Sequence, residues 1–213
     1  MKSIQLFITI ISILTVISCT EKKKTQEPTP ILKKEKYPTK KVAKSWDSLK
    51  KHNVEAFFTA YEKKNQETKV LIKTKFGNIK LLLYKDTPIH RANFIFLTKI
   101  KYFNTTVFYR VAKDFVIQGG NSDDLYTMKQ RHKYGNYLLK PEFRRHRKHK
   151  YGALAAARHW EGNPNKLSSP FEFYIVQNRK GAHHLNTEHT VFGEIISGFS
   201  TMEKISKVEV GVD

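Results

Sequence analysis

Residues 108–121 read FYRVAKDFVIQGGN, and this segment restricts how the chain can fold more than any other. Two short, largely apolar stretches flank a break at Ala-Lys-Asp, which is typical of two β-strands joined by a turn. Side chains point alternately to the two faces of a strand. We therefore expect Tyr109 and Val111 on one face, and Phe108 and Arg110 on the other.

A tight turn at residues 112–114 would bring the second strand back alongside the first. Phe115 and Gln118 would then lie beside Arg110, so that one surface combines a guanidinium, an aromatic ring and an amide. This combination predicts a binding site for an apolar ligand that carries a carbonyl group.

Short strands continue over most of the chain from residue 69 onward. Gly77 and Asn78 form the turn of another expected hairpin, and Thr87-Pro88 opens a helical pattern. We expect strands at residues 70–76, 79–84, 107–111, 115–118, 153–157, 173–177 and 190–194, and helices at residues 87–102 and 201–206. These strands and helices predict a mainly β fold, in which a closed barrel is capped by two helices. A domain of about 145 residues is large enough for one hydrophobic core.

The first eighteen residues predict export. Residues 4–17 are mostly apolar and follow Lys2, a pattern typical of a signal peptide. This apolar run is shorter than a membrane-spanning helix requires. The run ends at Val-Ile-Ser-Cys, which resembles the bacterial lipobox, so we expect residues 1–18 to be removed and Cys19 to carry a lipid. A secretory signal with an incidental cysteine is the alternative. Cys19 is the only cysteine, which excludes an intrachain disulfide.

Two further segments precede the strands. Residues 19–46 are rich in lysine, threonine, proline and glutamate and lack an apolar pattern, so we expect a disordered tether. Residues 47–68 predict an amphipathic helix, because apolar side chains recur three or four residues apart from Val54 to Tyr61. The expected organisation is a folded domain tethered to a membrane in the bacterial cell envelope, on its extracytoplasmic side.

Charge narrows the expected partners. The chain has 39 Lys and Arg against 19 Asp and Glu, a net charge of +20. This surplus favours solubility or contact with polyanions, and the nearest polyanion for a lipoprotein is an anionic lipid surface. We expect neither nucleic acid as a partner nor an oligomer. The histidines lack a fixed spacing with carboxylate or thiolate partners, so no metal or other cofactor is predicted.

Five segments, in the order of the family, resemble the cyclophilins, which are peptidyl-prolyl cis-trans isomerases. They read FGNIKLLLY with TPIHRANF, FYRVAKDFVIQGG, YGALAAAR, FEFYIVQ and HLNTEHTVFGEI. The resemblance covers residues 69–207 and implies an eight-stranded antiparallel barrel, with a helix over each end and a proline site on its outer face. The chain stops at Asp213, before the last strand of the family, so we expect that strand to be missing and residues 70–76 to form an open edge.

The resemblance also implies which residues form the site. Arg110, Phe115 and Gln118 are the expected catalytic residues, with Arg110 as the donor to the nitrogen of a twisted prolyl amide. The expected substrate-binding residues are Val116, Ala157, Arg158, Glu172, Tyr174, His184, Leu185 and His189. In this assignment the Ala157–Arg158 backbone holds the residue before proline.

Four positions depart from the commonest family pattern. Tyr174, Val116, Glu172 and His184 stand where phenylalanine, methionine, glutamine and tryptophan are usual. Glu172 matters most, because a carboxylate that pairs with Arg110 would compete with the substrate. Two functions remain open: an isomerase of Xaa-Pro bonds that assists the folding of exported proteins, and a non-catalytic binding module or holdase for proline-containing segments.

Overall fold

The computed structural model describes residues 49, 51–135 and 137–208. The expected signal peptide, the lipidation site Cys19 and the expected tether lie outside these residues. Within the described part of the chain, no helix is both long enough and apolar enough to cross a membrane.

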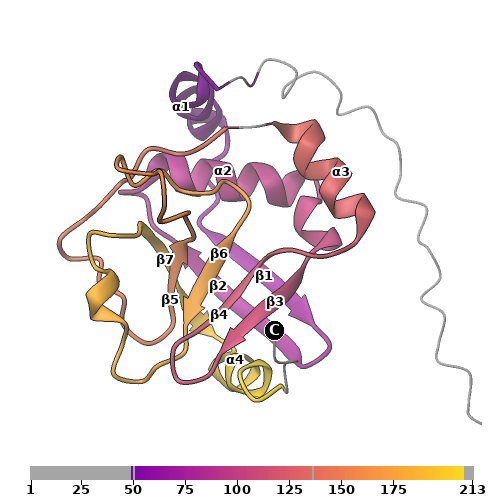
Figure 1. Cartoon of the computed structure of the whole chain (residues 1–213), viewed down its shortest axis with the longest axis vertical. Coiled ribbons are helices and arrows are strands. Elements are labelled where there is room, and N and C mark those ends of the chain that lie inside the picture. Colours follow the sequence, from indigo (N-terminus) through magenta and orange to yellow (C-terminus); the bar gives the residue numbers. More distant parts are fainter. Residues whose placement is uncertain (1–48, 50, 136, 209–213) are drawn as a thin grey trace, which may run out of the picture. The chain divides into compact units, whose positions relative to one another are not determined.

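The centre of the domain is one antiparallel sheet of seven strands, in the order β1-β2-β7-β5-β6-β4-β3. The strands are β1 (Lys69–Thr74), β2 (Gly77–Leu83), β3 (Val107–Ala112), β4 (Val116–Asn121), β5 (Ala153–Ala156), β6 (Phe173–Val176) and β7 (Val191–Ser197). The sheet curls, with α2 (Pro88–Lys99) across one end and α4 (Phe199–Ile205) across the other (Figure 1). The remaining helices are α1 (Val54–Lys64), α3 (Leu125–Tyr134) and the 3₁₀ turns η2 (Tyr102–Thr105) and η3 (His183–Leu185).

The sheet is open, so the prediction of a closed eight-stranded barrel is wrong for the part of the chain that the structure describes. Here β1 is hydrogen-bonded only to β2, and β3 only to β4. Closure requires a strand that bridges β1 and β3, and none of the described residues forms one. Among the described residues, β1 therefore has a partner on one side only.

The core lies inside the curl of the sheet. Ile117, Ile175 and Leu154 stand opposite one another on β4, β6 and β5 and are fully buried. Phe94 of α2 and Met202 of α4 join the same cluster from the two ends. Because alternate residues of each strand point inward, the residues between them are left for the outer face, where the site is expected.

A carboxylate from a distant loop completes the start of α2. Glu142 accepts hydrogen bonds from the backbone N–H groups of Ile89 (3.2 Å) and His90 (2.9 Å), which a helix start leaves without helical partners. Its own N–H donates to Thr190 Oγ1 at 3.0 Å, next to β7. The long connection between α3 and β5 is thereby held against both α2 and the sheet.

Helix α1 packs on α2. Phe58 is fully buried, and its ring lies 5.9 Å from that of Phe96 and 5.8 Å from that of Tyr137. Glu62 forms an ion pair with the buried Arg91 of α2. The helix is thus joined to the domain by a buried aromatic contact and by a charge pair.

Helix α3 was not predicted, because it lacks an apolar stripe: Leu125 and Met128 on its surface are exposed. Its start is marked by Asp124, whose side chain accepts a hydrogen bond from the Tyr126 N–H at 2.8 Å. Thr127 Oγ1 donates to the Thr105 carbonyl at 2.6 Å, so α3 is fixed beside η2 and the start of β3.

Candidate functional site

The hairpin at residues 107–121 forms as predicted. Strands β3 and β4 are antiparallel, and the Phe115 N–H donates to the Ala112 carbonyl at 3.1 Å across the turn. Asp114 adopts the left-handed conformation that the reversal needs, with φ of 55°.

The predicted side-chain directions in β3 are wrong, because the register shifts between Phe108 and Arg110. Phe108 and Val111 pack against the inner core, whereas Tyr109 and Arg110 are exposed. A β-bulge has this effect, since one extra residue interrupts the alternation of the strand. Tyr109 therefore joins Arg110 in the site.

Three of the expected site residues on the sheet, Arg110, Gln118 and Tyr174, lie in one row. Arg110 stands opposite Gln118, Gln118 opposite Tyr174, and Tyr174 opposite Ala155, across β3, β4, β6 and β5. Beside this row lies an apolar group that we call the outer-face cluster. It includes Val116, Ala155, Ala157, Tyr174, Val176 and Leu185, with Phe115 packed against them.

Two expected histidines lie at the margin of this cluster. His184 is exposed on η3, and its ring stacks on Phe115 with centroids 5.6 Å apart. His189 is buried, with Nδ1 3.0 Å from the Ala156 carbonyl and its ring edge-on to Tyr174 at 5.4 Å. Burial lowers the pKa of His189. The structure thus brings Phe115, Tyr174 and both histidines together with the apolar cluster.

The backbone expected to hold the residue before proline is only partly available. The N–H and the carbonyl of Ala157 are bonded to Glu172 (3.0 Å) and Ser169 (2.8 Å), so the sheet itself uses them. The N–H and carbonyl of Arg158 form no hydrogen bond with any described residue. Its side chain bonds Glu188 at 2.8 Å. Of these two residues, only Arg158 therefore has backbone groups that can still bond a substrate.

A chain of hydrogen bonds orients the polar side of the site. Arg110 Nη1 donates to Gln118 Oε1 at 3.4 Å, Gln118 Nε2 donates to the Tyr109 hydroxyl, and that hydroxyl donates to Glu172 Oε2 at 3.3 Å. Arg131 Nη1 of α3 donates to Glu172 Oε1 at 2.6 Å. Burial, and then the Glu172 charge, raises the pKa of Tyr109 and keeps it a donor. Every donor meets an acceptor, which fixes the orientation of the Gln118 amide.

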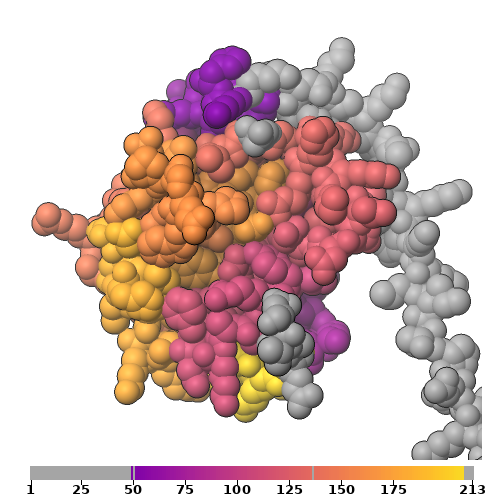
Figure 2. Space-filling model, viewed as in Figure 1, coloured from indigo at the N-terminus to yellow at the C-terminus, as the bar shows by residue number. Residues whose placement is uncertain are grey.

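The expectation that Glu172 competes for Arg110 does not hold, because its carboxylate is paired with Arg131. Among the described residues, no carboxylate forms an ion pair with Arg110. The surface in Figure 2 places α3 next to the β3–β4 hairpin, which is the arrangement that lets Arg131 reach Glu172. Arg110 keeps an uncompensated positive charge at the surface.

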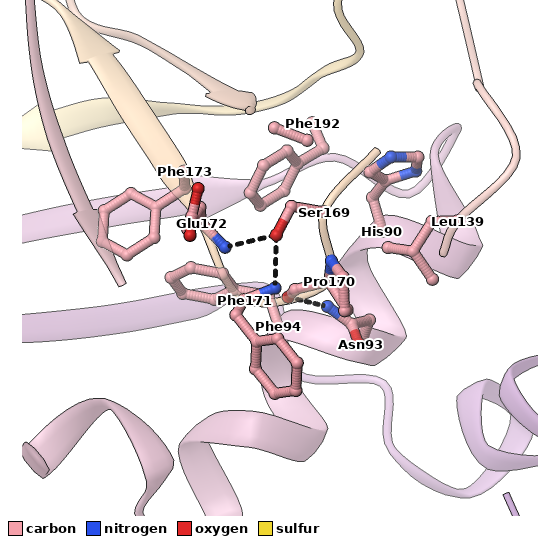
Figure 3. A pocket seen from close by; sticks show the side chains of 11 residues that line it. His90, Asn93, Phe94, Leu139, Ser169, Pro170, Phe171, Glu172, Phe173 and Phe192 are labelled. Carbon is pink, nitrogen blue, oxygen red and sulfur yellow. Dashed lines mark hydrogen bonds between the residues drawn. The ribbon is translucent and has the colours of Figure 1, made fainter. Parts of the chain in front are cut away.

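A cavity behind Glu172 is too small to be the site. It lies between α2 and the start of β6 and has a volume of about 10 Å³, close to the minimum for a single water molecule (Figure 3). Asn93 Nδ2 donates to the Pro170 carbonyl at 2.7 Å, and Ser169 Oγ accepts from the N–H of Glu172 at 3.3 Å. These bonds position the segment that carries Glu172. In the described part of the chain, no three His, Cys, Asp or Glu side chains are placed to hold a metal ion.

A buried histidine supports Tyr174 from below. The Tyr174 hydroxyl lies 2.9 Å from His149 Nε2, and His149 Nδ1 lies 3.0 Å from Asn186 Oδ1. Since the amide oxygen can only accept, Nδ1 carries the proton and Nε2 accepts from the tyrosine. Burial lowers the pKa of His149 to about 4. The hydroxyl that distinguishes Tyr174 from the usual phenylalanine therefore has a defined partner.

Sequence reasoning missed Tyr109, Arg131 and His149. A bulge that cannot be read from alternation turns Tyr109 outward, and Arg131 meets Glu172 from 41 positions away along the chain. His149 belongs to a basic run at residues 144–150. In that run His149 is buried, and Arg147 lies over the Tyr84 ring at 3.6 Å. No local sequence signal marks these contacts.

A curled antiparallel sheet, with a helix over each end and an Arg-Gln-Tyr row on its outer face, defines a cyclophilin-like domain. Residues 69–213 match the family model described as cyclophilin type peptidyl-prolyl cis-trans isomerase/CLD. The chain belongs to this family.

Curated relatives and solved structures agree with this assignment. The chain is 36% identical over 152 residues to peptidyl-prolyl cis-trans isomerase CYP59 of Arabidopsis thaliana, covering 66% of this chain but only 28% of that protein. It is 34% identical over 143 residues to a peptidyl-prolyl cis-trans isomerase of Acinetobacter baylyi, covering 66% and 73%. A Cryptosporidium parvum cyclophilin crystallised in the presence of the dipeptide Ala-Pro superposes with a TM-score of 0.53 at 27% identity, covering 65% of this chain and 85% of that one.

The buried His149 predicts loss of stability in acid. Its pKa of about 4 lies below the ordinary value of 6.5, so the unfolded state binds this proton more tightly. The contribution of neutral His149 to the free energy of unfolding is constant above about pH 6.5. Roughly 2–3 kcal/mol of this free energy is lost as the pH falls toward 4. Denaturant unfolding between pH 7 and pH 4 measures it. His149→Gln should flatten the profile, with exposed His52→Gln as the control; an unchanged slope in His149→Gln would contradict the assignment.

Proposed function

We propose that this chain isomerises Xaa-Pro bonds of proteins exported to the bacterial cell envelope and so assists their folding, while a lipid on Cys19 anchors it to a membrane. The proposed isomerase activity rests on one observation: Arg110, Gln118 and Tyr174 form a row across three paired strands, beside the apolar outer-face cluster. Since Arg110 is not neutralised by a carboxylate of the described residues, its charge remains available to a substrate.

An Xaa-Pro bond rotates slowly because amide resonance opposes twisting, with a barrier of about 18–20 kcal/mol. When the amide is twisted, the carbonyl loses this resonance and the prolyl nitrogen regains a lone pair. A catalyst must therefore bind the twisted amide more tightly than the planar one. A hydrogen-bond donor beside the prolyl nitrogen does this selectively, because that nitrogen accepts only after the twist.

Arg110 meets this requirement. Its guanidinium stays protonated and presents several N–H groups in a rigid plane, of which one bonds Gln118 and others remain for the substrate. The proline ring would lie against Phe115 and Tyr174 of the apolar side. The rotation breaks no covalent bond and transfers no proton, so this mechanism requires neither a nucleophile nor a metal.

The location is supported by the sequence. Residues 1–18 have the pattern of an export signal that ends at a lipobox-like Cys19, and a Lys- and Pro-rich segment follows. The net charge of +20 favours contact between this chain and an anionic membrane surface. The substrates would accordingly be proline-containing chains that fold outside the cytoplasm.

Replacing Arg110 tests the catalytic role. Arg110→Ala should lower kcat/KM about 10²- to 10³-fold, because the donor to the twisted amide is lost. Arg110→Lys should recover little, since a lysine cannot supply two coplanar donors. Exchange NMR of an Xaa-Pro peptide with the full chain, purified in detergent, measures the rate. Lys113→Ala, an exposed cation in the neighbouring turn, is the control. Peptide binding without any acceleration by the unaltered chain would instead support the non-catalytic binding module.

Replacing Cys19 tests the anchor separately. In a bacterium grown with radiolabelled palmitate, the unaltered chain should become labelled and partition with membranes, because the thiol at position 19 receives the lipid. Cys19→Ser should remain unlabelled. An unlabelled wild-type chain would contradict the lipid anchor and leave the isomerase assignment untouched.

A further inference from the structure

Trp160 lies beside the site and has no part in the proposed catalytic mechanism. It belongs to the connection between β5 and β6, residues 157–172, which lies in orange on the same face as the β3–β4 hairpin (Figure 2). Its side chain is 58% exposed, although indole is among the most apolar of side chains. A large aromatic ring that remains in water next to a binding site is a candidate contact for a ligand.

The ring is held in place. The Arg158 guanidinium lies over it at 4.0 Å, and the Arg158 side chain is itself only 3% exposed, because Glu188 binds it through both its carboxylate and its carbonyl. Asn163 closes the loop that follows with hydrogen bonds of 2.9 Å to His159 and Leu167. A ring that is already ordered loses little entropy when a ligand covers it.

The ring also continues the wall of the outer-face cluster. Trp160 meets His189 at 5.2 Å between ring centroids, with an interplanar angle of 67°, and His189 meets Tyr174 at 5.4 Å. Three aromatic rings therefore run without a break from the Arg110–Gln118–Tyr174 row to the exposed indole. A peptide bound over Tyr174 reaches Trp160 with a residue adjacent to its proline.

The free backbone of Arg158 indicates which residue this is. An extended peptide can pair with an unused N–H and carbonyl as an added strand does. Arg158 offers both groups, two positions before Trp160, and it is the backbone expected to hold the residue before proline. That residue then projects its side chain toward the indole.

We propose that Trp160 is a specificity-determining residue: it forms a subsite for an aromatic or large apolar side chain immediately before proline. This inference rests on the proposed function, because it takes the proline site as given. The chain should isomerise Phe-Pro and Leu-Pro bonds faster than Ala-Pro bonds, owing to contacts of these side chains with the indole.

The test compares peptides that differ only in the residue before proline. By exchange NMR with the full chain, Trp160→Ala should lower kcat/KM for a Phe-Pro peptide about 3- to 10-fold and for an Ala-Pro peptide less than about 2-fold. Tyr126→Ala, which removes an exposed aromatic side chain of α3, is the matched control. Equal losses for both peptides, or a preference that follows the residue after proline, would overturn the proposal.

A second measurement does not depend on turnover. The chain contains two tryptophans, so Trp46→Phe leaves Trp160 as the only source of tryptophan fluorescence. Titration of this variant with the Phe-Pro peptide should shift or quench its fluorescence more than titration with the Ala-Pro peptide. Fluorescence that stays constant while NMR shows the peptide bound excludes the subsite. If the peptide binds and changes the fluorescence but its isomerisation is not accelerated, the subsite proposal is supported and the proposed isomerase function is contradicted.

Discussion

The ion pair between Arg131 and Glu172 decides what the site can do, because it determines which cation remains free. Glu172 is linked to Arg110 through Tyr109 and Gln118, and an unpaired carboxylate at this position would attract the Arg110 guanidinium. Arg131 holds one oxygen at 2.6 Å and the Tyr109 hydroxyl holds the other at 3.3 Å. The carboxylate is thereby satisfied, and through Tyr109 it orients the Gln118 amide that bonds Arg110. A departure from the usual glutamine thus becomes part of the positioning of the site.

This arrangement depends on one feature inside the β3–β4 hairpin and on one outside it. The bulge in β3 turns Tyr109 to the side of Arg110, so that the hydroxyl can join Gln118 to Glu172. Helix α3, fixed by Thr127 to the Thr105 carbonyl, carries Arg131 to the carboxylate. The same bulge lets both Phe108 and Val111 pack against the inner core. The polar half of the site is therefore coupled to the core through β3 and to α3 through Arg131.

Local sequence patterns predicted the hairpin at residues 107–121 and the helix that begins at Pro88, because each depends on spacing along a single segment. The apolar residues that gather around Tyr174 come from several segments, and only the resemblance to the cyclophilins implied them. Local patterns failed for contacts between distant segments. The direction of Tyr109 depends on a register shift with β4, and the partner of Glu172 comes from a helix without an apolar stripe. Closure of the barrel was wrong because it depends on pairing at the β1 and β3 edges, which no segment of the described chain supplies.

The most direct test of this account is a double-mutant cycle between Arg131→Ala and Glu172→Gln, with kcat/KM for one Xaa-Pro peptide measured by exchange NMR. Glu172→Gln alone should retain activity, because the amide oxygen can still accept from the Tyr109 hydroxyl and no carboxylate is left at position 172 to attract Arg110. Arg131→Ala should lower kcat/KM several-fold when Glu172 is present and have little effect in the Glu172→Gln background, a coupling of about 1 kcal/mol. Equal effects of Arg131→Ala in both backgrounds would show that the pair only supports the fold, and would contradict the account.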